Sequence, residues 1–247
     1  MDDLFRPDVL IFLGGTLVAA FVHGIVGFAF AIVAAGIWLH ALPPAEATTL
    51  IVAYALLVQG YAVWKLRHSL NASRLTPFVI GTALGIPIGT AALRWVHPSY
   101  LRMGVGALLL LYGVYGLTRA RLPAVPDAGR AADTGVGVLN GVLGGATGLG
   151  GLLPAIWSNM RGWPRHEQRA MFQPAAAATF VITIVFLSGM GIVTQESMRL
   201  FAIGLPALAA GTWLGWRCYG QLNEDSFRTA VWIFLLVSGL LLLLPGK

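Results

Sequence analysis

The chain has 247 residues, of which 57% are hydrophobic and only 11% are charged, and its mean hydropathy is +0.77. Soluble domains usually carry about 25% charged residues, so this composition excludes an ordinary soluble enzyme or binding module. The net charge of +6 falls in loops between apolar segments, where it signals membrane orientation rather than nucleic-acid binding. The single cysteine, Cys218, excludes an internal disulfide and a cysteine metal cluster. We therefore predict an all-α polytopic membrane protein.

About eight apolar segments of roughly 20 residues fit this length, and each could cross a hydrocarbon core of about 30 Å. The first segment runs from Val9 to about Leu42 and is interrupted at 23–27. The fifth follows a linker over 119–133 and is rich in glycine. The other segments lie at about 45–64, 76–95, 100–118, 168–189, 197–217 and 226–244.

The two halves of the chain align with each other around the linker. His23-Gly-Ile-Val-Gly27 lies over Asn140-Gly-Val-Leu-Gly144, and Glu46 lies near Glu167. An ordered internal repeat of this kind is common in membrane transporters. We predict one compact transmembrane domain built from two four-segment repeats, 1–118 and 134–247, that are joined by the linker 119–133.

The stretch from Thr134 to Met160 contains eight glycines within seventeen residues and no acid or base. It is apolar enough to enter a bilayer, but its glycines and Pro154 argue against one regular helix. In lipid, non-helical backbone survives only where protein buries it or a watery cavity receives it. The segment therefore predicts two half-helices whose ends meet at a ligand site. The alternative is close helix packing, which small residues spaced four apart also favour.

Charge counting distinguishes two topologies. If all eight segments cross the membrane, nine basic residues lie on one face and seven on the other, which gives the protein no preferred orientation in the membrane. If segments one and five are broken and re-entrant, eleven basic residues share one face and five share the other, as the positive-inside rule requires. The two halves are then expected to be inverted copies, with both termini outside. The acidic start, MDDLFRPD, predicts no cleaved signal peptide.

All ten carboxylates lie in loops or at segment ends. A carrier for sodium, magnesium or a transition metal normally offers carboxylates or clustered His and Cys at depth. A cation substrate is therefore disfavoured, and we expect no metal site and no cofactor. Helix N-termini, hydroxyls and amides favour an anion instead. GGATGLGG lacks the Lys-Ser/Thr ending of a phosphate loop, and its turn holds Thr147 rather than a nucleophilic serine, so we predict no enzyme.

Polar residues within the apolar segments are the candidate binding groups. His23 is the only imidazole well inside such a segment, and it could bind an anion, carry a coupling proton or bond a backbone carbonyl. Asn140 could donate an amide N–H to the ligand or cap a half-helix, and Thr147 is the best hydroxyl donor. The other polar positions expected to face a cleft are Thr48, Thr49, Tyr54, Gln59 and Gln173.

The chain contains two glycine-rich segments, VHGIVGFAFAIVAAG and LNGVLGGATGLGGLLPAIW. The second segment is followed by the run RGWPRHEQRAMFQP. With the glycine-spaced third and seventh segments, these motifs resemble the sulfite exporter TauE/SafE family, also called the 4-toluene sulfonate uptake permeases. The resemblance covers nearly the whole chain, although GFAFA stands where the family often has a richer glycine run. It implies a multi-pass carrier of the bacterial cytoplasmic membrane for sulfite, sulfonates or other small organic anions. Carried over by position, it implies that these residues lie near the substrate: His23, Gly24, Gly27, Asn140, Gly144, Thr147 and Gly148.

The function predicted from these features is secondary transport of a small anion by alternating access between inverted halves. The expected partners are the anionic substrate and the lipid bilayer, with no nucleic acid. Proton coupling through His23 and a homodimer are left open. Two other functions are alternatives: a channel for a small solute, which would conduct far faster than a saturable carrier, and a membrane assembly protein that transports nothing.

Overall fold

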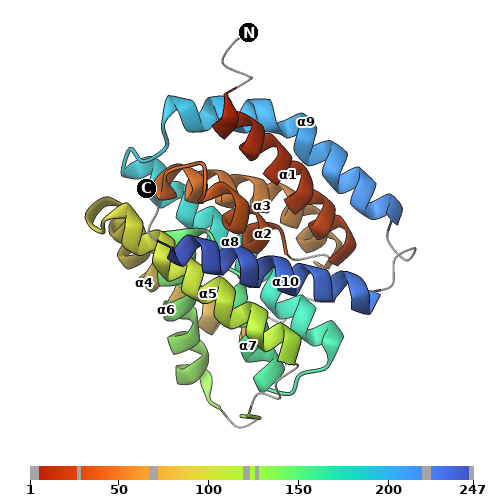
Figure 1. Cartoon of the computed structure of the whole chain (residues 1–247). Helices are drawn as coiled ribbons and strands as arrows, with labels where there is room; N and C mark the ends of the chain where they lie inside the picture. Colours follow the sequence, from red (N-terminus) through yellow and green to blue (C-terminus); the bar gives the residue numbers. More distant parts are fainter. Residues whose placement is uncertain are drawn as a thin grey trace. The chain divides into compact units, whose positions relative to one another are not determined.

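The computed structural model describes residues 6–26, 29–66, 72–118, 123–125, 128–218 and 224–244, which form helices joined by turns (Figure 1). The prediction of an all-α protein is confirmed for these residues, which contain no strand. Both segments predicted to be broken are pairs of helices, but the interruption predicted at 23–27 is wrong for residues 23–26, which belong to α1. The first half of the chain holds α1 (Pro7–Val26), α2 (Phe30–Trp38), α3 (Pro44–Leu66), α4 (Ala72–Trp95) and α5 (Pro98–Thr118). The second half holds α6 (Arg130–Thr147), α7 (Leu152–Met160), α8 (Arg165–Gly189), α9 (Gln195–Cys218) and α10 (Glu224–Leu243).

Several of these helices are long and apolar enough to cross a membrane. Five reach that length among the described residues, and a shorter apolar helix covers Thr229–Leu243. The chain is therefore a multi-pass membrane protein by length and composition. The eight-segment inverted repeat is not confirmed and stays a prediction. The five long spans are Pro7–Ile25, Ala72–Trp95, Pro98–Thr118, Ala170–Gly189 and Gln195–Cys218.

The helices group into two compact units that each combine parts of both sequence halves. The first unit consists of Met1–Ile51, Val96–Ala120 and Thr194–Lys247, and the second of Val52–Trp95 and Arg121–Val193. The first unit thus holds α1, α2, α5, α9, α10 and the start of α3. The second holds α4, α6, α7, α8 and the rest of α3. The predicted repeat boundaries are not tested by this grouping.

In the first unit, α1 and α2 form an antiparallel hairpin. The indole Nε1 of Trp38, the last residue of α2, donates to the carbonyl of Phe12 near the start of α1 over 3.2 Å. The two rings also pack at 5.0 Å between centroids. Because α2 begins just after α1 ends, this contact means that α2 runs back along α1 (Figure 1).

Helix α9 packs along α1 in the same direction, with glycines at the contact. A methyl group on Gly211 would overlap the carbonyl of Leu17, and one on Gly215 would overlap that of Phe21. Such small-residue contacts let helix backbones approach closely, which is how helices associate in lipid.

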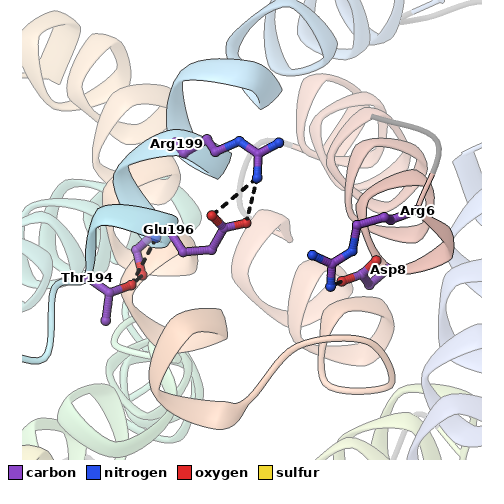
Figure 2. Close-up of polar contacts among 6 residues, drawn as sticks. Arg6, Asp8, Thr194, Glu196 and Arg199 are labelled. Carbon is purple, nitrogen blue, oxygen red and sulfur yellow. Dashed lines mark hydrogen bonds and ion pairs between the residues drawn. The ribbon is translucent and has the colours of Figure 1, made fainter. Parts of the chain in front are cut away.

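Polar contacts lie at the starts of these two parallel helices (Figure 2). Thr194 precedes α9, and its Oγ1 accepts the backbone N–H of Ser197 over 3.0 Å, an N-cap contact. Arg199 donates to both carboxylate oxygens of Glu196 at 3.3 Å, and Arg6 pairs with Asp8 at 2.9 Å at the start of α1. Exposed pairs of this kind contribute about 0–1 kcal/mol, so they mark a polar end of the unit rather than hold it together.

In the second unit, α4 and α6 run parallel with their backbones in contact. On α4, Gly81, Gly85 and Gly89 face the carbonyls of Thr134, Val138 and Val142 on α6. On α6, Gly137, Gly141 and Gly145 face the carbonyls of Phe78, Thr82 and Ile86 on α4. Helix α8 joins the pair through Phe78, Met171 and Ala175, which form a buried apolar cluster. Close packing, the alternative explanation of the glycine run, therefore accounts for three of its glycines.

Glycine substitutions on α6 should differ according to the face. Gly141→Ala places a methyl group against the Thr82 carbonyl, and overpacking of this kind costs about 1–3 kcal/mol. Gly135→Ala is the matched control, because nothing lies within 4 Å of its added methyl and alanine favours a helix by up to about 1 kcal/mol. Thermal unfolding in detergent should show a lower midpoint for Gly141→Ala only. Equal midpoints for both variants would contradict the observed α4–α6 contact.

Candidate functional site

The glycine-rich segment breaks between Thr147, where α6 ends, and Leu152, where α7 begins. Gly148 caps α6 in the left-handed conformation, with φ 75° and ψ 3°, and its N–H donates to the Gly144 carbonyl over 2.8 Å. This conformation suits glycine because it has no Cβ. Thr147 stabilises the turn, since its hydroxyl donates to the Leu143 carbonyl at 2.7 Å and accepts the Leu149 N–H at 3.3 Å.

Helix α7 returns along α6, so the chain leaves the segment at the end where it entered. Trp157 Nε1 on α7 donates to Asp133 Oδ1 in the first turn of α6 over 2.7 Å. Arg161 Nε lies 3.9 Å from the same carboxylate oxygen, and the Met160 carbonyl accepts the Val125 N–H at 2.8 Å. Asp133 is only 6% exposed. The hairpin that re-entrant insertion requires is therefore present and closed by a buried acid.

Threonines from α4 and α8 surround Asn140, one turn before Gly144 on α6. The Nδ2 of Asn140 donates to Thr179 Oγ1 at 3.0 Å and to Thr82 Oγ1 at 3.4 Å. Each threonine hydroxyl donates in turn to a carbonyl, Thr179 to Ala175 at 2.8 Å and Thr82 to Gly137 at 3.2 Å. The hydroxyl hydrogens are thus used, so the group facing both oxygens must be the amide N–H₂.

The break itself packs on Thr179. A methyl group on Gly144 would lie 2.6 Å from Thr179 Cγ2, and one on Gly150 would lie 2.5 Å from the same atom. Two glycines with no side chain therefore let α8 approach the turn, and the same residue also contacts Asn140. Asn140, Gly144, Thr147 and Gly148, which the sequence predicts to lie near the substrate, belong to the last two turns of α6 and its C-cap, and their role in binding stays a prediction.

Backbone donors are available at the start of α7. The N–H groups of Gly150 and Gly151 donate to no other described residue, whereas the next one, from Leu152, reaches the Leu149 carbonyl at 3.3 Å. Unused N–H groups at a helix start carry partial positive charge and suit an anion. No acid or base occurs from Thr134 to Met160 to compete with such a ligand.

The remaining predicted residues lie elsewhere. In the second unit, Gln59 on α3 and Gln173 on α8 are 5% and 7% exposed, and no hydrogen bond joins either one to the described residues of the break. Thr49, in the first unit, donates to the Ala45 carbonyl of its own helix at 2.9 Å, a structural bond. Gly27 lies outside the described residues.

His23 and Gly24 lie near the end of α1 in the first unit. His23 is buried, with 6% of its surface exposed. A methyl group on Gly24 would lie 2.9 Å from the Cα of Gly215 and 3.0 Å from the carbonyl of Thr212 on α9. Close packing therefore explains Gly24 without a ligand. That both breaks face one substrate stays a prediction.

Three residues of this site escaped sequence reasoning: Thr82, Thr179 and Asp133. Each has an unremarkable polar side chain in the sequence, and only the parallel packing of α4, α6 and α8 brings the threonines to Asn140. The sequence places Asp133 directly before the apolar segment, but its bond to Trp157 requires that α7 turn back along α6.

A match to a protein-family model identifies the class of protein to which this helical, multi-pass chain belongs. The model described as sulfite exporter TauE/SafE matches residues 11–242, nearly the whole chain. The protein therefore belongs to the TauE/SafE family of sulfite exporters, a family of membrane transporters rather than enzymes. Comparisons with curated proteins and with solved structures found no significant match.

Removing the acid that closes the hairpin should destabilise the second unit. Asp133→Ala leaves the Trp157 N–H without its acceptor and Arg161 without its carboxylate, and an unsatisfied buried group costs about 1–3 kcal/mol. The matched control is Asp8→Ala, whose pair with Arg6 is exposed and is worth about 0–1 kcal/mol. Thermal unfolding followed by Trp fluorescence should show a clear loss for Asp133→Ala alone. A loss of the same size in both variants would refute the closing role.

Proposed function

We propose that the protein is a secondary transporter that exports sulfite or a related small organosulfur anion across the bacterial cytoplasmic membrane. The observation that carries this proposal is the α6–α7 hairpin, whose break at residues 148–151 interrupts an apolar segment. Irregular backbone of this kind is tolerated at membrane depth only where protein or a watery cavity surrounds it. Membership of the sulfite exporter family supports the class of substrate.

The anion would bind at the start of α7. The N–H groups of Gly150 and Gly151 are suited to an anionic ligand. The lack of any carboxylate between Thr134 and Met160 also favours a negatively charged ligand. Broken helices with N-termini directed at an anionic substrate are a recurrent device in secondary transporters. No covalent step is needed, since transport only requires binding and a change of access.

The basic end of the second unit supports an orientation for the hairpin. Helices α4, α6 and α8 begin at this end, where Arg130 donates to Ser73 at 2.9 Å and Arg74 pairs with Glu167. Arg161, at the end of α7, lies there too. The positive-inside rule would place these arginines in the cytoplasm, so the hairpin would enter the membrane from the cytoplasmic side. The break would then meet anions at an intermediate depth, as alternating access requires.

Transport in proteoliposomes tests this function. Wild-type protein should show saturable sulfite flux and counterflow, because a carrier binds its substrate before it translocates it. Flux through a channel would neither saturate nor show counterflow. Gly148→Val should reduce the flux at least about tenfold, since a β-branched residue in the left-handed conformation costs about 1–2 kcal/mol and shifts the turn.

The matched control is Gly148→Asn, because asparagine adopts the left-handed conformation readily and should keep most of the flux. Detergent-purified variants must elute as the wild type does, so that a misfolded protein is not scored as an inactive one. Flux without saturation would favour the channel. No flux of sulfite, sulfonates or small carboxylates would reject the transporter.

A further inference from the structure

In the side-chain amide of Asn140, the nitrogen is hydrogen-bonded but the oxygen is not. Asn140 is fully buried, and its Oδ1 finds no hydrogen-bond donor among the residues that the structure describes. Both protons of Nδ2 are used by Thr82 and Thr179, and those hydroxyls have their own acceptors. A flip that exchanges Oδ1 and Nδ2 of the amide would lose both of these bonds. The acceptor Oδ1 is therefore held in its present position. The donor role expected for Asn140 is already used inside the protein.

A second unsatisfied group lies one turn further along α8. Thr183 is fully buried, and its Oγ1 has no hydrogen-bond partner among the described residues. Residues four apart share a face of a helix, so Thr183 follows Thr179 on the side that meets Asn140, Gly144 and Gly150. Buried polar groups are nearly always paired in native proteins, and an unpaired one costs about 1–3 kcal/mol. Two of them, on the two helices that Thr179 joins near the break, indicate that a ligand completes the set.

The polar groups around the break are therefore of two kinds. The N–H groups of Gly150 and Gly151 are donors, which suit a negatively charged oxygen. Asn140 Oδ1 is an acceptor that would repel such an oxygen and needs an N–H or O–H instead. Resting on the proposed function, we infer that the preferred substrate is an anion that carries its own hydrogen-bond donor, such as hydrogen sulfite or a sulfonate with a hydroxyl group.

Asn140 Oδ1 would distinguish substrates of equal charge. A fully deprotonated dianion, or a sulfonate with only an alkyl tail, would satisfy the N–H groups but leave Asn140 Oδ1 unpaired. A site that keeps a buried polar group unpaired discriminates strongly against the ligand that leaves it so. Oδ1 is enclosed in this packed arrangement, so the donor would reach it only through a local opening at the break that keeps the bonds from Asn140 Nδ2 to Thr82 and Thr179.

Two sulfonates of equal charge and nearly equal shape test the inference. 2-Hydroxyethanesulfonate and 1-propanesulfonate differ by a hydroxyl in place of a methyl, and neither changes charge near neutral pH. Competition against sulfite uptake in proteoliposomes should show that the wild type binds the hydroxyl compound about tenfold more tightly or better, the ratio expected for one buried hydrogen bond.

Asn140→Leu should abolish this preference, because leucine removes the acceptor that distinguishes the hydroxyl from the methyl group. The variant should fold, since Thr82 and Thr179 keep their carbonyl acceptors. Asn159→Leu makes the same change at an exposed position on α7 and should keep the preference. A thermal-shift measurement with each compound gives a second readout that does not depend on transport.

Other results would overturn the inference. Equal competition by the two sulfonates in the wild type would remove the acceptor from the substrate site while leaving the transporter in place. Stabilisation of the wild type, but not of Asn140→Leu, by sodium chloride over choline chloride would assign the oxygen to a cation. If neither sulfonate nor sulfite is bound or transported, the proposed function fails, and the inference fails with it.

Discussion

The backbone groups freed where α6 stops must find partners within the protein, because lipid offers none. The second unit meets this constraint with short polar contacts. Gly148 returns its N–H to Gly144, Thr147 bonds on both sides of the turn, and Thr179 of α8 packs on the two glycines of the break. Around the break, the described groups without a hydrogen-bond partner include the N–H groups of Gly150 and Gly151 and the buried oxygens of Asn140 and Thr183. These unpaired donors and acceptors form the proposed substrate site.

Glycine serves two purposes in α6 and the turn that follows it. Gly137, Gly141 and Gly145 recur every four residues and place the α6 backbone against α4. Gly144 and Gly150 instead face Thr179 on α8, and Gly148 turns the chain. The α4 contact packs the first part of the hairpin closely, because both backbones carry glycines at the contact. The turn can therefore be open to a ligand without loosening the helix that bears it.

Much of this arrangement could be predicted from residue types and spacing. The break near Gly148, the helical class and the cluster of Asn140, Gly144 and Thr147 all follow from a glycine-rich apolar segment that cannot stay one helix. The close packing of every fourth glycine was an open alternative, and it holds for one face of α6. These features depend on the segment itself, which is why one sequence suffices for them.

Features that depend on neighbouring helices could not be predicted in this way. Asn140 looks like a donor in the sequence, but Thr82 and Thr179 arrive from segments 58 and 39 residues away and take its protons. Gly24 looks like part of a site, but α9 packs against it. The role of Asp133 likewise requires α7 to turn back and bring Trp157 to it. In each case the sequence supplies the group, and the tertiary packing decides whether the group stays available.

The central claim is that the segment from Arg130 to Met160 enters and leaves the membrane on one face. Cysteine labelling tests it directly, because Cys218 is the only cysteine and Cys218→Ser gives a clean background. Single cysteines at the exposed positions Ala131 and Asn159, before and after the break, and at Ser188 at the far end of α8, can be probed with a membrane-impermeant maleimide in oriented vesicles. The account predicts that Ala131→Cys and Asn159→Cys react from the cytoplasmic side and Ser188→Cys from the other. Reaction of Ala131→Cys and Asn159→Cys from opposite sides would contradict it.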